Sequence, residues 1–151
     1  MAPSATPDRM SLTTAATREI LFDVEGYTTT KLMSDGSGRY FQSDEFTVGG
    51  YDWAVRYYPD RVGLYVSVTL VLLSELKNAG QEVGVSFACA LRNWLGERWR
   101  FRASYVFSRH GQEMGFWRFA RHDALEAPGF IVDDCFTLVC AVSVLRKLNK
   151  Y

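Results

Sequence analysis

The chain has 151 residues, of which 48% are hydrophobic and 15% aromatic, and its 17 basic residues balance 17 acidic ones. This composition excludes a disordered chain, whose signature is low hydrophobicity with high net charge, and the length predicts one domain. A net charge of zero argues against a nucleic-acid partner, because non-specific affinity for nucleic acids comes from neutralising phosphates.

The cysteines and the hydrophobic runs predict a location inside the cell. Cys89, Cys135 and Cys140 form an odd set without a CxxC spacing, which favours structural thiols over a disulfide framework. Residues 1–10 lack the apolar segment of a signal peptide, and no run approaches the ~20 apolar residues of a membrane span. We therefore expect a cytoplasmic or nuclear protein without a membrane partner.

Strand signals dominate the first part of the chain. Residues 1–16 are rich in Pro, Ser, Thr and Ala, which predicts a flexible leader. Apolar residues alternate over residues 20–24 in a first strand that ends at Gly26. A loop around residues 34–38 then leads to a strand over residues 40–48.

The pair Gly49-Gly50 predicts a tight hairpin, because glycine tolerates the positive φ angles that such a turn requires. On the strand that follows, Trp53, Val55 and Tyr57 share one face, which indicates an aromatic core. Pro59 has no N–H to give to a ladder and is expected to end the pairing.

Alternation continues toward the C-terminus. Residues 66–73 become apolar on both faces, which predicts a central strand covered on two sides. Residues 83–91 place large side chains on one face and small ones on the other, which leaves room for something to approach closely. The remaining expected elements are a loop over residues 94–102, a strand over 103–107, a short helix near 116–125 and a strand over 136–144.

The fold class follows from this order of elements. About eight short strands separated by turn signals, with one minor helix, predict an all-β protein, an antiparallel sandwich. The helix rests on the helical spacing of Phe116, Phe119 and Ala120.

The residue types needed for catalysis or metal binding are not grouped in the sequence. His110 and His122 are the only histidines, and no HxH or HxxxH pair accompanies them. Adjacent residues on a strand point to opposite faces, so Asp133 and Asp134 fit a turn better than an acid–base pair. No nucleophile elbow or phosphate-binding loop is present. We expect a protein that is not an enzyme and holds neither a cofactor nor a metal.

Several segments in family order resemble the MATH domain (meprin and TRAF-C homology), above all the version in plant MATH–BTB (BTB/POZ and MATH domain-containing) proteins. The matching pieces are Phe22 to Tyr27 with Lys31, Phe46 to Trp53, Tyr57 to Pro59, Tyr65 to Val68, Gly115 to Phe119, Leu125 to Ala127 and Asp133 to Val144. The resemblance implies a TRAF-like β-sandwich over residues 17–145, followed by a tail over residues 146–151.

This resemblance also implies a function. Family members bind short, extended peptide segments of partner proteins in a shallow groove, and in MATH–BTB proteins a BTB domain docks onto a cullin-RING ubiquitin ligase. The implied role is selection of proteins for ubiquitin-dependent degradation through degron-like segments. No BTB segment follows residue 151 here, so the alternative is a lone MATH protein that regulates or competes with full-length MATH–BTB proteins without recruiting a ligase.

Groove positions can be carried over from a well-characterised animal member. Phe87, Tyr105 and Phe116 keep an aromatic residue of that groove, and Glu113 keeps an acidic charge. Three positions depart from the pattern: Thr69 stands for a tyrosine, Gln112 for a lysine and Met114 for a tryptophan. A flexible thioether in place of a rigid aromatic platform broadens tolerance and weakens specificity. Strand parity places Phe87 on the core face, so core and groove remain alternatives for this residue.

Overall fold

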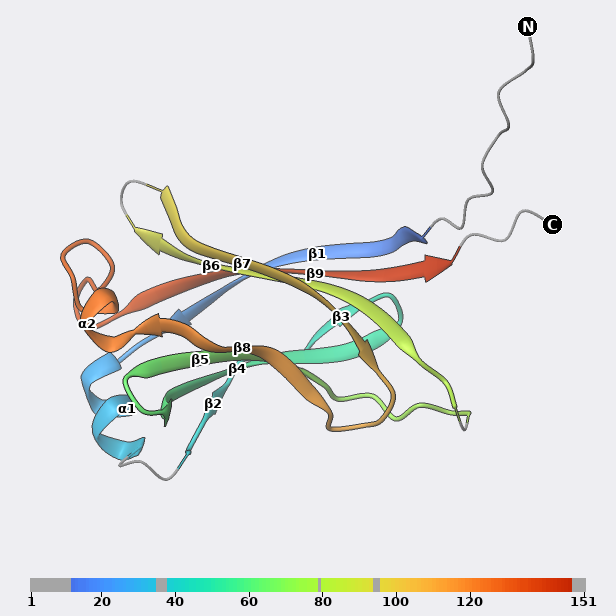
Figure 1. Ribbon diagram of the computed structural model, residues 1–151, viewed down its shortest axis with the longest axis horizontal. Coiled ribbons are helices and arrows are strands. Elements are labelled where there is room, and N and C mark those ends of the chain that lie inside the picture. Colours follow the sequence, from blue (N-terminus) through green and yellow to red (C-terminus); the bar gives the residue numbers. More distant parts are fainter. Residues whose placement is uncertain (1–11, 35–37, 79, 94–95, 148–151) are drawn as a thin grey trace, which may run out of the picture.

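Two antiparallel sheets lie face to face in the computed structural model, which describes residues 12–34, 38–78, 80–93 and 96–147 (Figure 1). The first sheet has the order β1 (Leu12–Val24), β9 (Phe136–Lys147), β6 (Val83–Asn93) and β7 (Gly96–Phe107). The second has the order β2 (Phe41–Gln42), β4 (Tyr51–Val62), β5 (Tyr65–Leu72) and β8 (Glu113–Arg121), and β3 (Phe46–Val48) also pairs with β4. The predicted antiparallel sandwich is confirmed.

The hairpin at Gly49-Gly50 forms as predicted. Val48 pairs with Tyr51, and the two glycines have φ angles of 63° and 82°. An added Cβ at Gly49 would also lie 2.7 Å from the Cβ of Val144 on the opposite sheet, so this turn packs directly on the sandwich.

The core fills the space between the sheets. Trp53, Val55 and Tyr57 are fully buried and face inward from β4, as the alternation predicted. Trp53 meets Phe107 edge to face at 5.1 Å, and Tyr57 meets Phe136 in the same way at 5.3 Å. Edge-to-face contacts of this kind stabilise by about 0.5–1.5 kcal/mol beyond the burial of area. These pairs fasten the second sheet to the first.

The central strand and the buried cysteines also agree with the sequence. Every residue of β5 from Val66 to Leu72 is buried, and β5 runs between β4 and β8. Cys89 and Cys140 are free, buried thiols that face each other across β6 and β9, with their Sγ atoms 3.1 Å apart. Burial raises the pKa of the Cys89 thiol, and its contact with Cys140 raises it further. Both thiols act as core side chains.

Two predicted loops are wrong because strand pairing extends over them. Strand β1 begins at Leu12, inside the expected leader, and pairs with β9 up to Lys147. The expected loop over residues 94–102 is largely strand, since β6 and β7 form one long hairpin in which Asn93 pairs with Gly96. Both strands depend on partners that the local composition does not reveal. Residues 1–11 and 94–95 lie outside the described residues.

The strand expected over residues 40–48 is divided into β2 and β3. Ser43 separates them, because its N–H donates to the Val55 carbonyl at 2.9 Å and its Oγ accepts from the Val55 N–H at 2.9 Å. The regular ladder of β4 ends at Tyr58, as Pro59 predicted, but the strand resumes and Val62 pairs with Tyr65. A proline in an irregular stretch costs no ladder bond.

The helix predicted near residues 116–125 is wrong over most of its length. Residues 116–121 belong to β8, and only α2 (His122–Leu125) is helical. Phe116 pairs with Val68 and Ala120 with Val66, so β8 carries a bulge of extra residues between these two pairs. The bulge lets both Phe116 and Phe119 pack on the core, and in the sequence this spacing imitates a helix.

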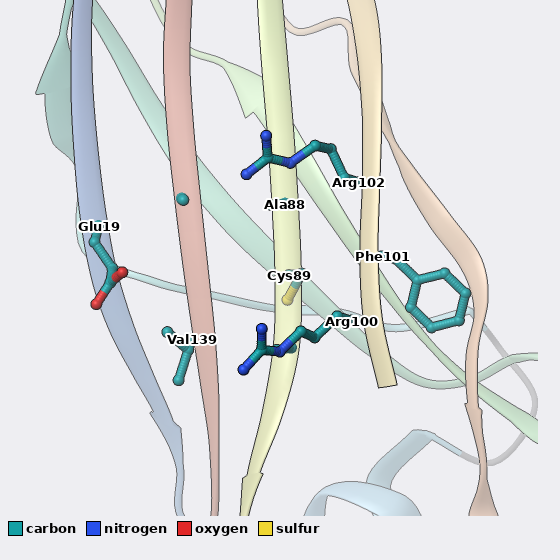
Figure 2. Close-up of a pocket in the computed structure, with 9 residues that line it drawn as sticks. Glu19, Ala88, Cys89, Arg100, Phe101, Arg102 and Val139 are labelled. Carbon is teal, nitrogen blue, oxygen red and sulfur yellow. The ribbon is translucent and has the colours of Figure 1, made fainter. Parts of the chain in front are cut away.

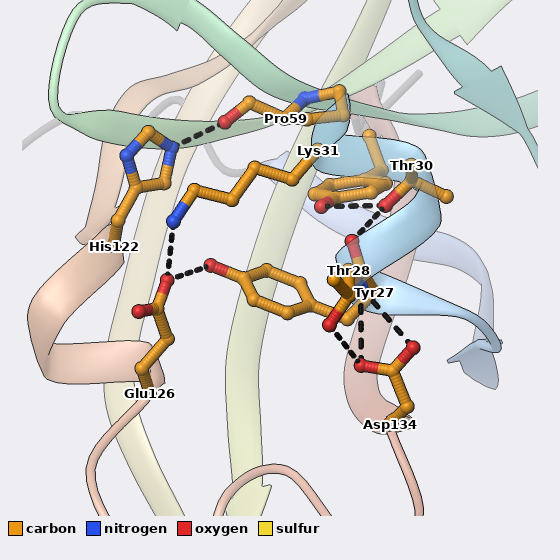
Figure 3. Close-up of polar contacts among 9 residues, drawn as sticks. Tyr27, Thr28, Thr30, Lys31, Pro59, His122, Glu126 and Asp134 are labelled. Carbon is orange, nitrogen blue, oxygen red and sulfur yellow. Dashed lines mark hydrogen bonds and ion pairs between the residues drawn. The ribbon is translucent and has the colours of Figure 1, made fainter. Parts of the chain in front are cut away.

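A helix that the sequence did not predict, α1 (Tyr27–Ser34), follows β1. Its three consecutive threonines are poor helix formers, and its start is fixed from the far end of the chain (Figure 3). The Asp134 carbonyl accepts from the Tyr27 N–H at 2.8 Å, and the Asp134 carboxylate accepts from the Thr28 N–H at 3.1 Å. Asp133 and Asp134 have positive φ angles of 52° and 61°, which agrees with the expected turn.

The same helix is held to α2 by a second polar contact (Figure 3). Glu126 accepts from the Tyr27 hydroxyl at 2.7 Å and pairs with Lys31 at 2.6 Å. The hydrogen bond from Lys31 lowers the pKa of Glu126, whereas burial, followed by the bond to Glu126, raises the pKa of Tyr27. These contacts hold α1 against the sandwich and give Lys31 and Glu126 a structural role.

The close approach of β5 and β8 gives the first prediction. A Cβ built on Gly115 would lie 2.4 Å from the Val68 carbonyl oxygen and 2.6 Å from the Thr69 Cα. These are backbone atoms that cannot rotate away, so we expect Gly115→Ala to lower the free energy of unfolding by about 2–3 kcal/mol. Chemical denaturation measures the change.

Gly84→Ala is the matched control. Gly84 also lies in a strand, and its added Cβ would meet only the Leu145 Cβ, at 3.8 Å. Alanine is favoured over glycine in a strand by about 0.5–1 kcal/mol, so this variant should be neutral or slightly more stable. Equal effects of the two substitutions would contradict the proposed backbone contact.

Candidate functional site

The candidate site lies along one side of the sandwich, where both sheets end. Strand β7 is the last strand of the first sheet and β8 the last strand of the second. The two are consecutive in the chain and run side by side along this side (Figure 1). Neither pairs with a further strand among the described residues, so a row of backbone donors and acceptors faces outward on each.

An aromatic and thioether cluster lies between these two edges. Tyr105 on β7 and Met114 and Phe116 on β8 point toward the core and remain partly exposed. The Tyr105 hydroxyl donates to the Gly115 carbonyl at 3.2 Å, which bridges the two sheets. Burial raises the pKa of Tyr105, which favours the protonated hydroxyl that donates this bond. The cluster combines apolar surface with one hydroxyl.

Phe87 supports this cluster from inside. Its ring stacks on Phe116 with 5.4 Å between the centroids and an interplanar angle of 9°, and Phe101 also packs on Phe116, at 5.4 Å. Phe87 is 0% exposed, so of the two alternatives for this residue the structure supports the core. A direct contact between Phe87 and a peptide is therefore not available. Its effect on a ligand would act through Phe116.

Thr69 and Glu113 lie on the other, outer face of the second sheet. The Glu113 carboxylate accepts hydrogen bonds from the Thr69 hydroxyl and the Tyr58 hydroxyl, each at 2.7 Å. Arg56 pairs with the same carboxylate at 3.3 Å. Thr69 is 0% exposed, so its predicted direct contact with a peptide is corrected to a supporting bond.

This arrangement controls the charge of the site. The Arg56 and Glu113 side chains are each 17% exposed, so their pair is more shielded from water than a surface salt bridge. Burial, followed by the hydrogen bond to Glu113, raises the pKa of Tyr58 to about 12. The acid at position 113 is thus neutralised within the protein by Arg56 and covered by two hydroxyl donors.

Gln112 has a local structural role in the turn between β7 and β8. Its side-chain oxygen accepts from the Ser108 N–H at 2.8 Å, and its carbonyl accepts from the Leu72 N–H at 3.0 Å. The N–H of Gly111 also donates to the Leu72 carbonyl at 2.8 Å. These bonds pin the crossing between the sheets to the end of β5, and so set how β7 and β8 align.

The sequence analysis missed the polar and aromatic partners on the outer face. Arg56 lies 4.2 Å from the Tyr40 ring centroid and bonds Gln42 at 3.0 Å, and Tyr58 packs on Trp117 at 5.4 Å. Arg61 covers the Trp117 ring at 4.6 Å. Alternation along β4 places Arg56 and Tyr58 together on the face opposite Trp53. Nothing in the sequence places them beside Glu113, which is far away along the chain.

Within residues 12–34, 38–78, 80–93 and 96–147, no three His, Cys, Asp or Glu side chains gather as metal ligands. His110 is exposed, and the ring of His122 contacts the Pro59 carbonyl oxygen (Figure 3). No helix in this part of the chain is long and apolar enough to cross a membrane.

Comparison with known proteins gives a consistent result. The family model for the MATH domain matches residues 19–142. The chain is 31% identical over 140 residues to BTB/POZ and MATH domain-containing protein 3 of Arabidopsis thaliana, which covers 83% of this chain and 33% of that protein. It is 34% identical over 139 residues to BTB/POZ and MATH domain-containing protein 5 of the same plant. This match covers 82% of this chain and 32% of that protein.

A mouse protein also matches over a shorter stretch. TD and POZ domain-containing protein 4 of Mus musculus is 36% identical over 102 residues, which cover 62% of this chain and 27% of that protein. The chain spans about one third of the length of the plant relatives described above.

The raised pKa of Tyr58 gives the second prediction. Its folded-state pKa of about 12 exceeds the ordinary value of 10.0, so the folded protein keeps the proton longer than the unfolded chain. The stability that Tyr58 contributes is therefore complete below pH 10 and is lost as the pH rises toward about 12. We expect Tyr58→Phe to cost about 1–2 kcal/mol at neutral pH.

The pH dependence distinguishes the contribution of the buried Tyr58 hydroxyl from that of the ring, because the phenylalanine variant keeps the ring and has no proton to lose at this position. Burial also raises the pKa of Tyr57 to about 12, so wild type and the Tyr58→Phe variant should both lose stability above pH 10. Wild type should lose more, so that the gap between the two unfolding free energies narrows as the pH rises. Denaturation series from neutral pH upward measure both curves, and parallel curves would contradict the raised pKa of the Tyr58 hydroxyl.

Proposed function

The chain belongs to the MATH domain family, a family of protein-interaction domains rather than enzymes, and we propose that it binds short, extended peptide segments of partner proteins along the β7–β8 edge. The observation that carries this proposal is the pair of unpaired strand edges beside the partly exposed cluster of Tyr105, Met114 and Phe116. An extended peptide is the ligand whose backbone matches a free strand edge.

Backbone hydrogen bonds would supply much of the affinity. A peptide strand beside β7 satisfies N–H and C=O groups that otherwise face water, without regard to the peptide's sequence. Side chains of alternate peptide residues then point either into the cluster or toward solvent. This mode explains how one shallow site can accept a segment of a larger protein.

The cluster would select an apolar residue at one peptide position. Tyr105 offers a ring face and, at its rim, a hydroxyl already bonded to Gly115. Met114 is unbranched and adaptable, so it fits several apolar shapes about equally well. We expect a preference for an apolar side chain at this position with broad tolerance among Leu, Ile, Val, Met and Phe.

The outer face of the second sheet would contribute selectivity among the charged and aromatic residues of a peptide. Glu113 is already paired with Arg56 and bonded by Tyr58 and Thr69, so it does not act as a free acceptor for a basic peptide. A peptide that crosses β8 meets Trp117 and the guanidinium of Arg61 instead. These groups favour an acidic or aromatic residue over a basic one.

The wider role is proposed from the relatives. Their names join a MATH domain to a BTB/POZ domain, and such proteins present substrates to a cullin-RING ubiquitin ligase. We propose that this MATH domain selects degron-like segments for the same pathway. Its alternative role is to compete with, or regulate, full-length MATH–BTB proteins.

Peptide binding is tested with an array of overlapping synthetic peptides, followed by fluorescence-anisotropy titration of the best ligand. The variant is Tyr105→Ala with Met114→Ala, because both side chains line the cluster and neither is fully buried. We expect the dissociation constant to rise by about tenfold or more. Phe116→Ala is less suitable, since it would also remove the stacking partner of Phe87.

Tyr65→Ala is the matched control. Tyr65 is also a partly exposed tyrosine, but it lies at the far end of β5 and pairs with Arg121. Circular dichroism and thermal melting confirm that each variant is folded. Undiminished binding by the folded double variant, or an equal loss in Tyr65→Ala, would contradict the proposed site.

A further inference from the structure

The outer face of the first sheet is a surface that the proposed peptide binding does not use. A hollow of about 220 Å³ lies on it, lined by small residues of β6 and β9 with charged residues on both sides (Figure 2). Those on β6, Ala88 and Ala90, are among the small residues that the alternation over residues 83–91 places on one face. Nothing among the described residues covers this face from outside.

Strand register places two opposite charges in a single row. Glu19 pairs with Ala141, Ala141 with Ala88, and Ala88 with Arg102. The row therefore crosses the whole sheet, with a carboxylate on strand β1, two alanines in the middle and a guanidinium on strand β7. Glu19 and Arg102 are exposed. Arg102 extends across β6 toward the middle of the face, whereas the Glu19 carboxylate lies beside β1 (Figure 2).

Apolar side chains on the same face are also left in water. Leu21 on β1 is 53% exposed and Val106 on β7 is 49% exposed. Arg100, beside Arg102 on β7, also borders the hollow. The face thus combines exposed apolar groups, small central residues that permit close approach, and an acidic edge opposite a basic edge.

We propose that this face binds a second copy of the same chain through a two-fold axis parallel to the strands. Such an axis exchanges the two edges, so β1 of one copy lies over β7 of the other. Glu19 of each copy then faces Arg102 of its partner, which gives two equivalent ion pairs. The alanines meet at the centre, and Leu21 of one copy packs on the aliphatic part of Arg100 in the other.

The charge order selects this arrangement over others. A two-fold axis running across the strands would place Arg102 over Arg102 and Glu19 over Glu19, which repel. A small anion would use the arginine edge but leave Glu19 without a partner. When a second copy binds, Glu19 and Arg102 of each chain face the opposite charge on the other chain, so neither is left without a partner.

The available area suits a modest dimer. Four strands spaced about 4.8 Å apart, each of roughly 11 residues at ~3.3 Å, form a face on the order of 700 Å². Stable interfaces bury about 800 Å² per partner. Two aligned sheets pack with only a small rotation between the strand directions of one sheet and the other, so most of this area stays in contact. The inward cluster of Tyr105 and the outward edge of β7 stay open in this dimer.

Charge-reversal variants of the full chain test the proposal by sedimentation velocity from about 10 μM to 1 mM. Wild type should show a monomer–dimer equilibrium within this range. Glu19→Arg and Arg102→Glu should each weaken self-association by about tenfold or more, because each places like charges opposite one another. The double variant E19R/R102E should recover it.

A mixture of the two single variants gives the sharpest result. Combining E19R with R102E restores both ion pairs in a mixed dimer, so the mixture should associate more tightly than either variant alone. Arg118→Glu, which reverses an exposed charge on β8 of the other sheet, is the matched control and should dimerise like wild type.

Three outcomes would overturn the proposal. One is a wild type that remains monomeric up to about 1 mM. This outcome counts against the proposal even if another protein or an anion binds the face. The second is a mixture of E19R and R102E that stays monomeric while both are folded. The third is self-association that Arg118→Glu weakens as much as the other reversals. Peptide affinity of E19R should equal that of wild type, which separates this test from that of the peptide site.

Discussion

The contact between β4 and the opposite sheet is the interaction on which the rest of the structure depends. Trp53 and Tyr57 place their rings edge to face against Phe107 and Phe136, and all four side chains are buried. Because Phe107 ends the edge strand β7 and Phe136 begins the inner strand β9, this packing fixes two strands of the first sheet relative to the second. The sandwich can close only in the register that these aromatic pairs allow.

Closure in this register produces the site as a consequence. The five residues after Phe107 must cross from one sheet to the other, and Gly111 and Gln112 bond this crossing to Leu72. The edges of β7 and β8 are thereby brought side by side, with Tyr105 bonded to Gly115 between them. Gly115 permits the close approach of β8 to β5 that this alignment requires. The site is thus built on rigid strands rather than on loops.

Sequence reasoning succeeded where short-range alternation decides the structure and failed where distant residues do. Trp53, Val55 and Tyr57 reveal a buried strand face by their spacing, and the same logic identified β5 and β9. Helix α1 begins where Asp134 caps it from 106 residues away, so its threonines gave no local signal. Likewise, the sequence indicated Glu113 as a site residue but could not show that Arg56 and Tyr58 neutralise and cover it.

The central claim is that packing of the two sheets leaves the β7–β8 edge as the surface for a partner peptide. Amide chemical-shift mapping during titration with the best array peptide tests it most directly. The account predicts that the largest shifts fall on β7 and β8, around Tyr105 and from Met114 to Phe116. Largest shifts on the outer face of the first sheet, around Ala88 and Ala141, would contradict it.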